Sequence, residues 1–345
     1  ALAAGLNKAA RNHILIRDTS ALEQMRNVDV VVFDKTGTLT EGHPTVIGWL
    51  WAQGQEEHYK DVLLAAESTS DHPLAEAIVT ALEGEEQVIP AHLDGFENIT
   101  GKGVRVAYQG AEYWVGSHKL LKDYQANLSD ILADMLTQYE SDGNSIVYFG
   151  RENDLLAVIA IKDQLRVTSM EAIRELRIQD IEICMLTGDG ERTASSVAGS
   201  LGIMRFVADA MPDDKEDFIH KLQLQGKTVA MVGDGVNDAQ ALSCADVSIA
   251  MGKGTDTLMD TAMITLRTSD LLLLPKVFRL SRQTVSLMYR NLFWAFIYNT
   301  VGIFVAAGVL YPVYDILLSP ALAGAAMALS CVSVALSSLR LSSRF

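Results

Sequence analysis

The hydrophobic pattern of the chain predicts a series of buried strands, each of which ends at a polar turn. Residues 30–33 are four consecutive apolar residues, and Asp34 follows them directly. Such a run is typical of a parallel strand that is covered on both faces. The same pattern predicts strands at residues 181–186, 228–232, 247–250 and 262–266, with a helix at 192–201. This alternation predicts a doubly wound α/β domain formed by residues 20–45 and 158–275.

The pattern differs between residues 46 and 157, where helices and paired strands are mixed. Residues 58–82 predict a helix in two pieces, interrupted at His72 and Pro73, and residues 104–108 and 112–115 predict a hairpin. A helix at 129–139 and strands at 145–149 and 155–161 complete the segment. We therefore expect residues 46–157 to form a separate α+β domain that is inserted into the first one.

Two long stretches without charged residues follow Pro275, at residues 292–310 and 316–337. Each is long enough to span a bilayer. Lys and Arg precede the first stretch and follow the second, whereas the connector at 311–315 has neither. The positive-inside rule then predicts a transmembrane helix pair at residues 286–340 with both ends in the cytoplasm. Buried soluble helices are the alternative interpretation.

Residues 1–19 begin with small residues and continue with basic ones. We expect them to be the cytoplasmic end of a preceding transmembrane helix, with a soluble helix as the alternative. The chain of 345 residues has a net charge of −15, which argues against nucleic acid as a partner. Its three cysteines form no CxxC pair, so a disulfide scaffold is not expected.

Asp34 is the strongest candidate for chemistry in the chain. In open α/β sheets the reactive groups lie just beyond the carboxyl ends of the strands. Asp34 ends such a strand, and a Lys, a Gly and three Thr follow at once. Backbone N–H groups and hydroxyls should therefore surround its carboxylate. This environment suits a nucleophile that attacks phosphorus and forms an aspartyl phosphate.

Two further strands end in polar sequences, Thr187-Gly188-Asp189 and Gly233-Asp234-Gly235-Val236-Asn237-Asp238. We expect both ends to meet Asp34 at one sheet edge. Phosphoryl transfer needs a divalent cation and fixed donors for the phosphate oxygens, and Asp34, the carbonyl of Thr36 and Asp234 are expected to bind Mg²⁺. The remaining catalytic candidates are Lys35, Thr187, Gly188, Asp189, Lys215, Asn237 and Asp238. Thr187 and Lys215 are expected to hold phosphate oxygens, and Asn237 and Asp238 to orient the loop.

The sequence DKTGTLT at residues 34–40 is the phosphorylation signature of the P-type ATPases. Nearly the whole chain resembles the C-terminal half of the heavy-metal (CPx) branch of that family. The resemblance implies ATP as substrate and a dehalogenase-like phosphorylation domain with an inserted nucleotide domain. By the same resemblance, the residues that receive the adenine and ribose are Glu67, His72, Gly101, Gly103 and Gly116.

Thr36 separates this interpretation from the nearest alternative. The loop also resembles that of dehalogenase-type phosphatases, which have a second Asp two residues after the nucleophile as general acid/base. Here that position is Thr36, which cannot transfer a proton near neutral pH. An acyl phosphate on Asp34 should therefore persist. A membrane-tethered phosphatase remains one alternative, and an ATP-binding regulatory domain that the hairpin only anchors is another.

The predicted hairpin suggests the transported ion. Tyr298-Asn299 and Met327-x-x-Ser330-Cys331 resemble the YN and MxxSS motifs of Cu⁺-exporting ATPases, although Cys331 departs from the usual Ser. Thioether and thiolate ligands select Cu⁺. A Zn²⁺/Cd²⁺-type ATPase is the alternative, but zinc-type relatives have an Asp in the last span, and Asp315 lies in the connector.

The resemblance also implies a location and partners. We expect an integral membrane protein of a bacterial plasma membrane with cytoplasmic catalytic domains, in contact with the lipid bilayer and a metal chaperone. An intramembrane CPC sequence and a TGE loop do not occur in the chain. The actuator domain and the CPC helix are thus expected to lie in a missing N-terminal half of the pump.

Overall fold

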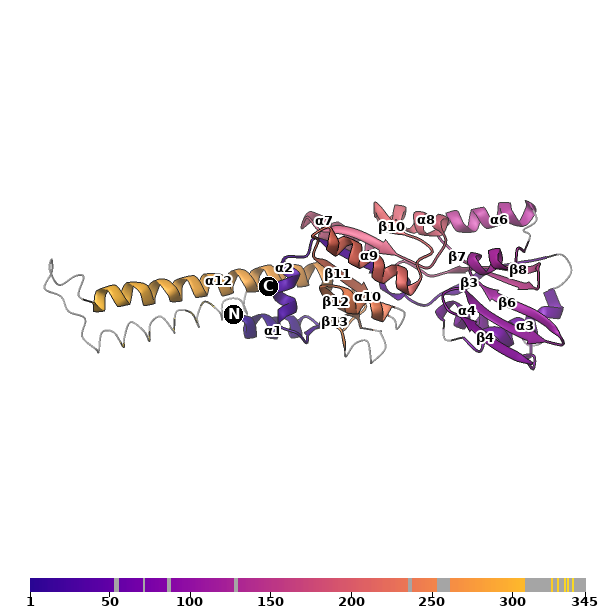
Figure 1. Cartoon of the computed structure of the whole chain (residues 1–345), viewed down its shortest axis with the longest axis horizontal. Helices are drawn as coiled ribbons and strands as arrows, with labels where there is room; N and C mark the ends of the chain where they lie inside the picture. The colour runs from indigo at the N-terminus through magenta and orange to yellow at the C-terminus, as the bar shows by residue number, and fades with distance from the viewer. Residues whose placement is uncertain are drawn as a thin grey trace.

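The computed structural model describes residues 1–52, 56–70, 72–85, 88–126, 130–234, 238–252 and 261–307, together with the single positions 324, 328, 332, 334 and 337. Figure 1 shows an elongated molecule in which two domains lie side by side. One domain is built on a seven-stranded sheet and the other on a six-stranded sheet. A long helix extends from the seven-stranded domain, away from the other domain (Figure 1).

The seven-stranded sheet confirms the predicted doubly wound α/β domain. Its strands lie in the order β1-β13-β12-β11-β2-β9-β10, so β2 (Val30–Asp34) has neighbours on both sides. The other strands are β1 (Ile14–Ile16), β9 (Glu182–Leu186), β10 (Arg205–Val207), β11 (Val229–Gly233), β12 (Val247–Met251) and β13 (Ile264–Leu266). All neighbouring pairs are parallel except β1 with β13.

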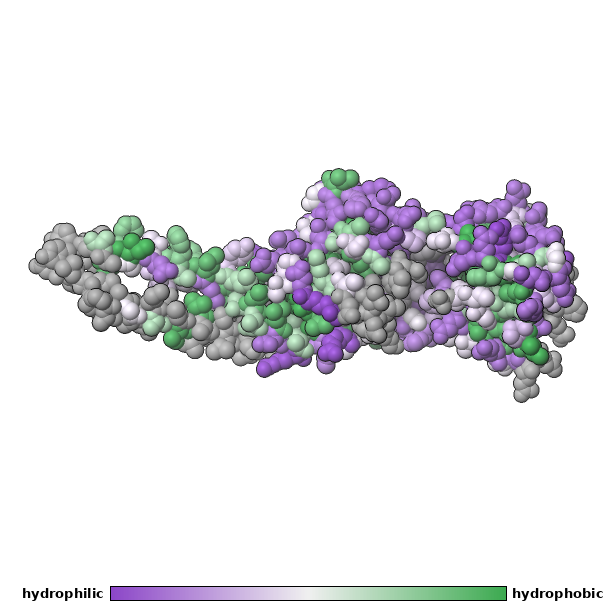
Figure 2. All heavy atoms as spheres, turned by 60° about the horizontal axis from the view of Figure 1, so that its bottom comes forward, coloured by the Kyte–Doolittle hydropathy of each residue, from purple (hydrophilic) through white to green (hydrophobic). Residues whose placement is uncertain are grey.

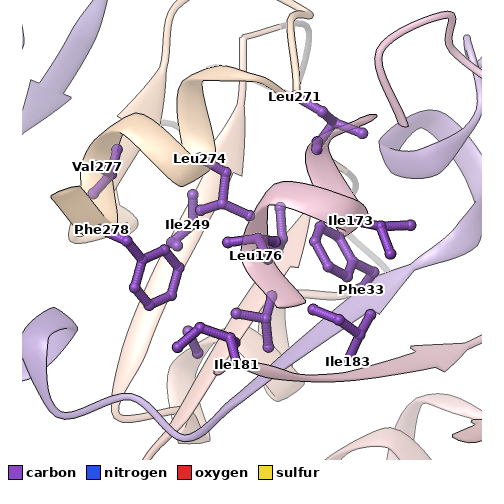
Figure 3. Packing of buried hydrophobic residues seen from close by; sticks show 14 of the residues in the cluster. Phe33, Ile173, Leu176, Ile181, Ile183, Ile249, Leu271, Leu274, Val277 and Phe278 are labelled. Carbon is purple, nitrogen blue, oxygen red and sulfur yellow. The ribbon is translucent and has the colours of Figure 1, made fainter. Parts of the chain in front are cut away.

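Successive residues of β2 point to opposite faces of the sheet, and each face has its own core. Val31 and Phe33 belong to one core with Ile173, Leu176 and Phe278 (Figure 3). Val30 and Val32 belong to the core on the opposite face, together with Ile219, Leu222 and Leu242. The covering helices are α2 (Ser20–Arg26), α7 (Ser169–Ile178), α8 (Glu191–Leu201), α9 (Pro212–Leu224) and α10 (Ala239–Cys244). By the same alternation, Asp34 lies on the face that α9 and α10 cover.

The six-stranded sheet confirms the predicted insertion. It is antiparallel, in the order β3-β8-β7-β6-β5-β4. Its strands are β3 (Thr45–Trp51), β4 (Gly95–Ile99), β5 (Gly103–Tyr108), β6 (Ala111–Gly116), β7 (Ser145–Arg151) and β8 (Asp154–Lys162). The helices are α3 (Glu56–Glu67), α4 (Pro73–Glu83), α5 (His118–Asp123) and α6 (Asp130–Ser141). The sheet extends five residues beyond the predicted end of this domain at residue 157, because β8 pairs with β3 as far as Lys162.

The two ends of the chain differ from the prediction. Helix α1 (Leu2–Arg11) stops well before residue 19, and residues 14–16 form β1, which joins the large sheet beside β13. At the other end, the first turns of α12 (Leu273–Ala306) lie in the domain core, where Leu274, Val277 and Phe278 are buried. Farther along, its side chains are exposed and largely apolar, including Leu292, Phe293, Trp294 and Phe296 (Figure 2).

The predicted transmembrane pair at residues 286–340 is not supported by the structure. Among the residues that the structure describes, no helix is both long enough and apolar enough to cross a bilayer. Residues 292–306 of the first predicted stretch lie in the outer part of α12. Most of the second predicted span lies outside the described residues.

Gly103 allows two strands of the small sheet to approach closely. It pairs with Gly116 across β5 and β6, and its φ of +144° is one that other residues avoid. A Cβ atom on Gly103 would lie 2.1 Å from the carbonyl oxygen of Val115, and one on Gly116 would lie 2.1 Å from that of Lys102. Both glycines therefore have a packing role that is independent of any ligand.

We expect Gly103→Ala to lower the free energy of unfolding by about 3 kcal/mol or more, because a strained φ and a backbone clash add together. Gly110→Ala is the matched control: its φ is +77°, but a Cβ there meets no atom within 4 Å. That change should cost about 1 kcal/mol. Urea unfolding followed by tryptophan fluorescence reports on this domain, because Trp49, Trp51 and Trp114 lie in its sheet. Equal losses in the two variants would contradict the packing role.

Candidate active site

Three strands that lie side by side bring the predicted residues together. Strands β9, β2 and β11 are neighbours, and their register places Leu186 beside Asp34 and Val232 beside Phe33. The residues after each strand therefore meet at one sheet edge, as the sequence predicted. Of the predicted catalytic residues, Asn237 lies outside the described part of the chain.

Asp34 is held by a lysine from the first turns of α9. The Nζ atom of Lys215 lies 2.6 Å from Oδ1 of Asp34 and 2.8 Å from Oδ1 of Asp238. All three side chains are at least nine-tenths buried. Burial alone would lower the pKa of Lys215, but the two carboxylates raise it above its usual value. Lys215 therefore stays charged and neutralises part of the negative charge on Asp34.

Asp234 completes a group of three carboxylates. Oxygen atoms of Asp34, Asp234 and Asp238 all lie within 4.8 Å of one another. Burial and the nearby Asp34 charge raise the pKa of Asp234 to about 7, and the same two causes raise that of Asp238 to about 7. Neighbouring carboxylates repel one another when all of them are ionised. A divalent cation bound between them removes this repulsion, so such a group is suited to bind one. The residues present therefore fit Mg²⁺.

The turn after β2 needs a glycine to make room for Asp234. Gly37 has φ +71°, and a Cβ on it would lie 1.6 Å from Oδ2 of Asp234. The Gly37 N–H donates to the hydroxyl of Thr40, 2.9 Å away, which fixes the return of the chain. Thr36, between Lys35 and Gly37, has an extended conformation with φ −73° and ψ +129°.

Lys35 points to the other side of the site. Its Nζ lies 2.5 Å from Oδ2 of Asp189 and donates to the hydroxyl of Ser145, 3.0 Å away. The Thr187 hydroxyl also donates to Asp189, over 2.7 Å. Burial would raise the pKa of Asp189, but Lys35, together with these hydrogen bonds, lowers it. Asp189 is therefore ionised and orients both Lys35 and Thr187. Gly188, which has no side chain, separates Thr187 from Asp189 in the sequence.

Two residues that the sequence analysis did not single out hold the turn after β2 in place through hydrogen bonds. Buried Arg166 donates from Nε to the carbonyl of Thr38 over 2.9 Å, and from its other end to the carbonyl of Gly37. Asp163 accepts from the Thr40 hydroxyl at 2.5 Å and from the Gly42 N–H at 3.1 Å. Asp163 follows the long apolar run of β8 after one intervening lysine, a sequence signal similar to the one that identified Asp34.

The predicted nucleotide residues lie in the small domain. His72 caps α4 by accepting the Leu74 N–H, and it is exposed. Partial enclosure of its ring by neighbouring atoms lowers its pKa although the residue is exposed, and the charges of Asp189 and Lys35 also act on it, so it lies near the Asp34 site. Glu67, at the end of α3, is 6% exposed, and its burial raises its pKa to about 8. A carboxyl with that pKa is mostly protonated at neutral pH and can donate a hydrogen bond.

The glycines of this predicted site divide into two kinds. A Cβ on Gly101, which has φ +69°, would lie 2.9 Å from Cε of Met211, immediately before α9. This turn therefore faces the large domain. Gly103 and Gly116 serve the pairing of β5 with β6, so the close approach of strands explains them without a ligand.

The structure places two of the five residues that were predicted to bind the transported metal. Tyr298 and Asn299 are exposed on α12, and the Tyr298 ring stacks on Trp294 at a centroid distance of 5.8 Å. Met327, Ser330 and Cys331 lie outside the described residues.

Comparisons with known proteins support the predicted resemblance. The copper-exporting P-type ATPase of Legionella pneumophila is 42% identical over 337 residues, which are 98% of this chain and 46% of the relative. The silver exporting P-type ATPase of Salmonella typhimurium is 43% identical over 98% of this chain and 41% of its own length. The chain thus spans less than half the length of these curated relatives.

Solved structures agree with the sequence matches. A zinc-transporting PIB-type ATPase in the E2.Pi state has a TM-score of 0.68 and 35% identity, over 99% of this chain and 54% of its own. The catalytic domain of the CPx-ATPase CopB-B has a TM-score of 0.66 and 28% identity, over 79% of this chain and 97% of its own. Residues 28–246 match the model of the haloacid dehalogenase-like hydrolases, which is more than half of the chain. The chain belongs to the haloacid dehalogenase-like hydrolase family.

Proposed function

We propose that the chain carries the phosphorylation and ATP-binding domains of a heavy-metal P-type ATPase, with Asp34 as the residue that is phosphorylated. The observation that carries this proposal is the position of Asp34 at the end of the central strand, 2.6 Å from Lys215 and within reach of two more carboxylates. The similarity to metal-exporting P-type ATPases over 98% of the chain supports it.

In the proposed reaction, a carboxylate oxygen of Asp34 attacks the γ-phosphorus of ATP. The bond between the γ-phosphorus and the bridging oxygen breaks, and ADP leaves with that electron pair. Lys215 and Thr187 are placed to stabilise charge on the transferred group. Asp34, the Thr36 carbonyl and Asp234 would hold Mg²⁺, whose charge offsets that of the phosphoryl oxygens. Thr36 has no acid/base function near pH 7, which favours a long-lived acyl phosphate over a phosphatase cycle.

ATP would lie between the two domains. Glu67, His72 and Gly101 of the small domain are proposed to receive the adenine and ribose. A protonated Glu67 supplies a donor there, and His72 lies on the side of the small domain that faces Asp34. Gly103 and Gly116 would then act by keeping the strands under this site close together.

The proposed cargo is Cu⁺. The resemblance of residues 298–299 and 327–331 to motifs of Cu⁺-exporting ATPases supports it, as do relatives named copper-exporting and silver exporting. Zn²⁺ is the second candidate, because a structural relative is a zinc-transporting ATPase. The further proposals are a bacterial plasma membrane as location, with the bilayer and a metal chaperone as partners.

Asp34→Asn should abolish labelling of the protein by γ-labelled ATP, because the amide keeps the side-chain shape but is a very poor nucleophile. The label on the parent protein should be stable to acid and removed by hydroxylamine. Asp213→Asn, at an exposed position in the first turn of α9, is the charge-matched control and should keep its label. Equal labelling of Asp34→Asn and the parent would overturn the assignment.

Stability without Mg²⁺ should fall as the pH rises from about 4 to about 7. The pKa of Asp234 and of Asp238 is about 7 in the folded protein, above the ordinary aspartate value of about 4. The folded state therefore binds more protons than the unfolded state across this window, and the free energy of unfolding decreases with pH. Mg²⁺ should raise the unfolding temperature more at pH 8 than at pH 5.

Asp234→Asn should reduce both the pH slope and the Mg²⁺ effect, because one of the repelling charges is gone. Asp213→Asn should change neither. Thermal unfolding with and without Mg²⁺ at the two pH values measures all of these quantities. A Mg²⁺ effect of the same size at both pH values would contradict the carboxylate site.

Met327→Leu should weaken Cu⁺ binding while leaving Mg²⁺ binding unchanged, because the thioether is lost at nearly constant volume. Met204→Leu, which alters a methionine that is 91% exposed on the large domain, is the matched control. Competition with a chromophoric Cu⁺ chelator under reducing conditions measures the affinity. If the two variants bound Cu⁺ equally well, Met327 would not be a ligand.

A further inference from the structure

A second group of metal-ligating side chains lies between α9 and α10, on residues that the proposed reaction does not use. Ligand atoms of Glu216, His220 and Cys244 all lie within 4.8 Å of one another. Glu216 and His220 are four residues apart on α9 and so share one face of that helix. Cys244 is the last residue of α10, which packs against α9. The three groups thus come from two separate helices.

A glutamine next to the group sets the protonation of the imidazole. Gln223 donates from Nε2 to the backbone carbonyl of Cys244 over 2.9 Å, which leaves its Oε1 facing Nδ1 of His220 at 3.1 Å. Oε1 can only accept, so Nδ1 has the proton and donates it. In neutral His220, the free lone pair is therefore on Nε2. This arrangement is the usual one around a metal-binding histidine, whose second nitrogen is held by a hydrogen bond.

The Nε2 lone pair faces another acceptor. An oxygen of Glu216 lies 3.5 Å from Nε2 of His220. Burial and the nearby Glu216 raise the pKa of the Cys244 thiol. A carboxylate and an imidazole lone pair repel each other unless a positive charge lies between them. A cation that all three side chains share would supply that charge.

We propose that Glu216, His220 and Cys244 form a binding site for Zn²⁺ or a divalent ion of the same class. One sulfur, one nitrogen and one oxygen ligand suit a borderline-soft ion that takes four tetrahedral ligands, with water as the fourth. Tetrahedral zinc places such ligand atoms about 3.3–3.6 Å apart. All three side chains are partly or fully exposed, so they can close to that spacing by rotation.

The position of the site connects it to the active site. Glu216 directly follows Lys215, which contacts Asp34, and α10 begins directly after Asp238, which contacts the same lysine. A cation that bridges Glu216 and Cys244 therefore links the two helices that position Lys215 and Asp238. Binding should hold these helices together and stabilise the large domain.

Zn²⁺ affinity is measured by competition with a chromophoric chelator, and Co²⁺ serves as a probe because it absorbs when a thiolate binds it. For the parent chain we expect a thiolate–Co²⁺ band and a Zn²⁺-dependent rise in unfolding temperature. Cys244→Ser should remove the band, and His220→Gln and Glu216→Gln should each weaken Zn²⁺ at least about tenfold. Gln223→Leu, which removes the hydrogen bond to His220, should also weaken it, by about tenfold.

Two matched variants separate this site from general charge effects and from other histidines. Asp217→Asn removes an exposed acid one position along α9, and His92→Gln removes an exposed histidine of the small domain. Both should keep the parent affinity and the Co²⁺ band. Circular dichroism confirms that each variant is folded.

Two results would overturn the proposal. One is a parent chain without a thiolate–Co²⁺ band, which would mean that the Cys244 thiolate does not bind the ion. The other is Zn²⁺ binding that is unchanged in Cys244→Ser but lost in Asp234→Asn, which would place the ion at the carboxylates around Asp34. Neither result would bear on phosphorylation of Asp34, which is measured separately.

Discussion

Repulsion among three carboxylates, two of them buried and one half-buried, is the constraint on which the rest of the large domain depends. Asp34, Asp234 and Asp238 are close enough to share one cation, and bringing three such groups together in a protein interior is unfavourable without compensating charge. Lys215 provides part of the compensation through contacts of 2.6 and 2.8 Å. The first turns of α9 must therefore lie above the ends of β2 and β11. The order of strands, with β2 between β9 and β11, makes that position possible.

The same constraint explains the backbone around the site. Asp234 occupies the space that a side chain at position 37 would need, so only glycine fits there. The carbonyls of Gly37 and Thr38 then turn toward Arg166, whose guanidinium satisfies them and also acts electrostatically on Asp234. Arg166 is nine-tenths buried without a carboxylate at hydrogen-bonding distance among the described residues. It therefore has a structural role in fixing the turn and an electrostatic role that limits the repulsion at Asp234.

The sequence predicted the central strands well, and also that the polar residues at their ends meet, because both depend on local signals. Residues 30–33 are all apolar since both faces of β2 are covered, and Asp34 stands out because it ends that run. The strands β1 and β10 at the two sheet edges were not predicted, because three residues each are too few to show a period. Arg166 was missed for a different reason. Its function depends on carbonyls more than 120 residues earlier in the chain, and no local pattern indicates them.

The beginning of α12 shows that composition alone does not locate the end of a domain. The sequence analysis ended the large domain at residue 275, which lies in the first turn of α12. The structure instead packs Leu274, Val277 and Phe278 into the core of the large domain. A helix can begin in a domain core and continue beyond it. Composition alone does not show where the part in the core ends.

The contacts between the two domains are numerous but individually weak. The Thr193 hydroxyl donates to the carbonyl of Asn144 at 2.7 Å, Lys119 donates to the carbonyl of Asp209 at 2.6 Å, and Arg192 pairs with Glu140 at 3.2 Å. The ion pair of exposed Arg192 contributes about 0–1 kcal/mol, and hydrogen bonds such as the other two contribute about 0.5–1.5 kcal/mol each. The buried contact of Lys35 with Asp189 and Ser145 differs, because its partners come from both domains and it lies beside Asp34. Separation of the domains would leave the Asp189 pair intact and remove only the Ser145 hydrogen bond. The contact between the two domains beside Asp34 therefore depends on the hydrogen bond to Ser145 and not on the charge pair of Lys35 with Asp189.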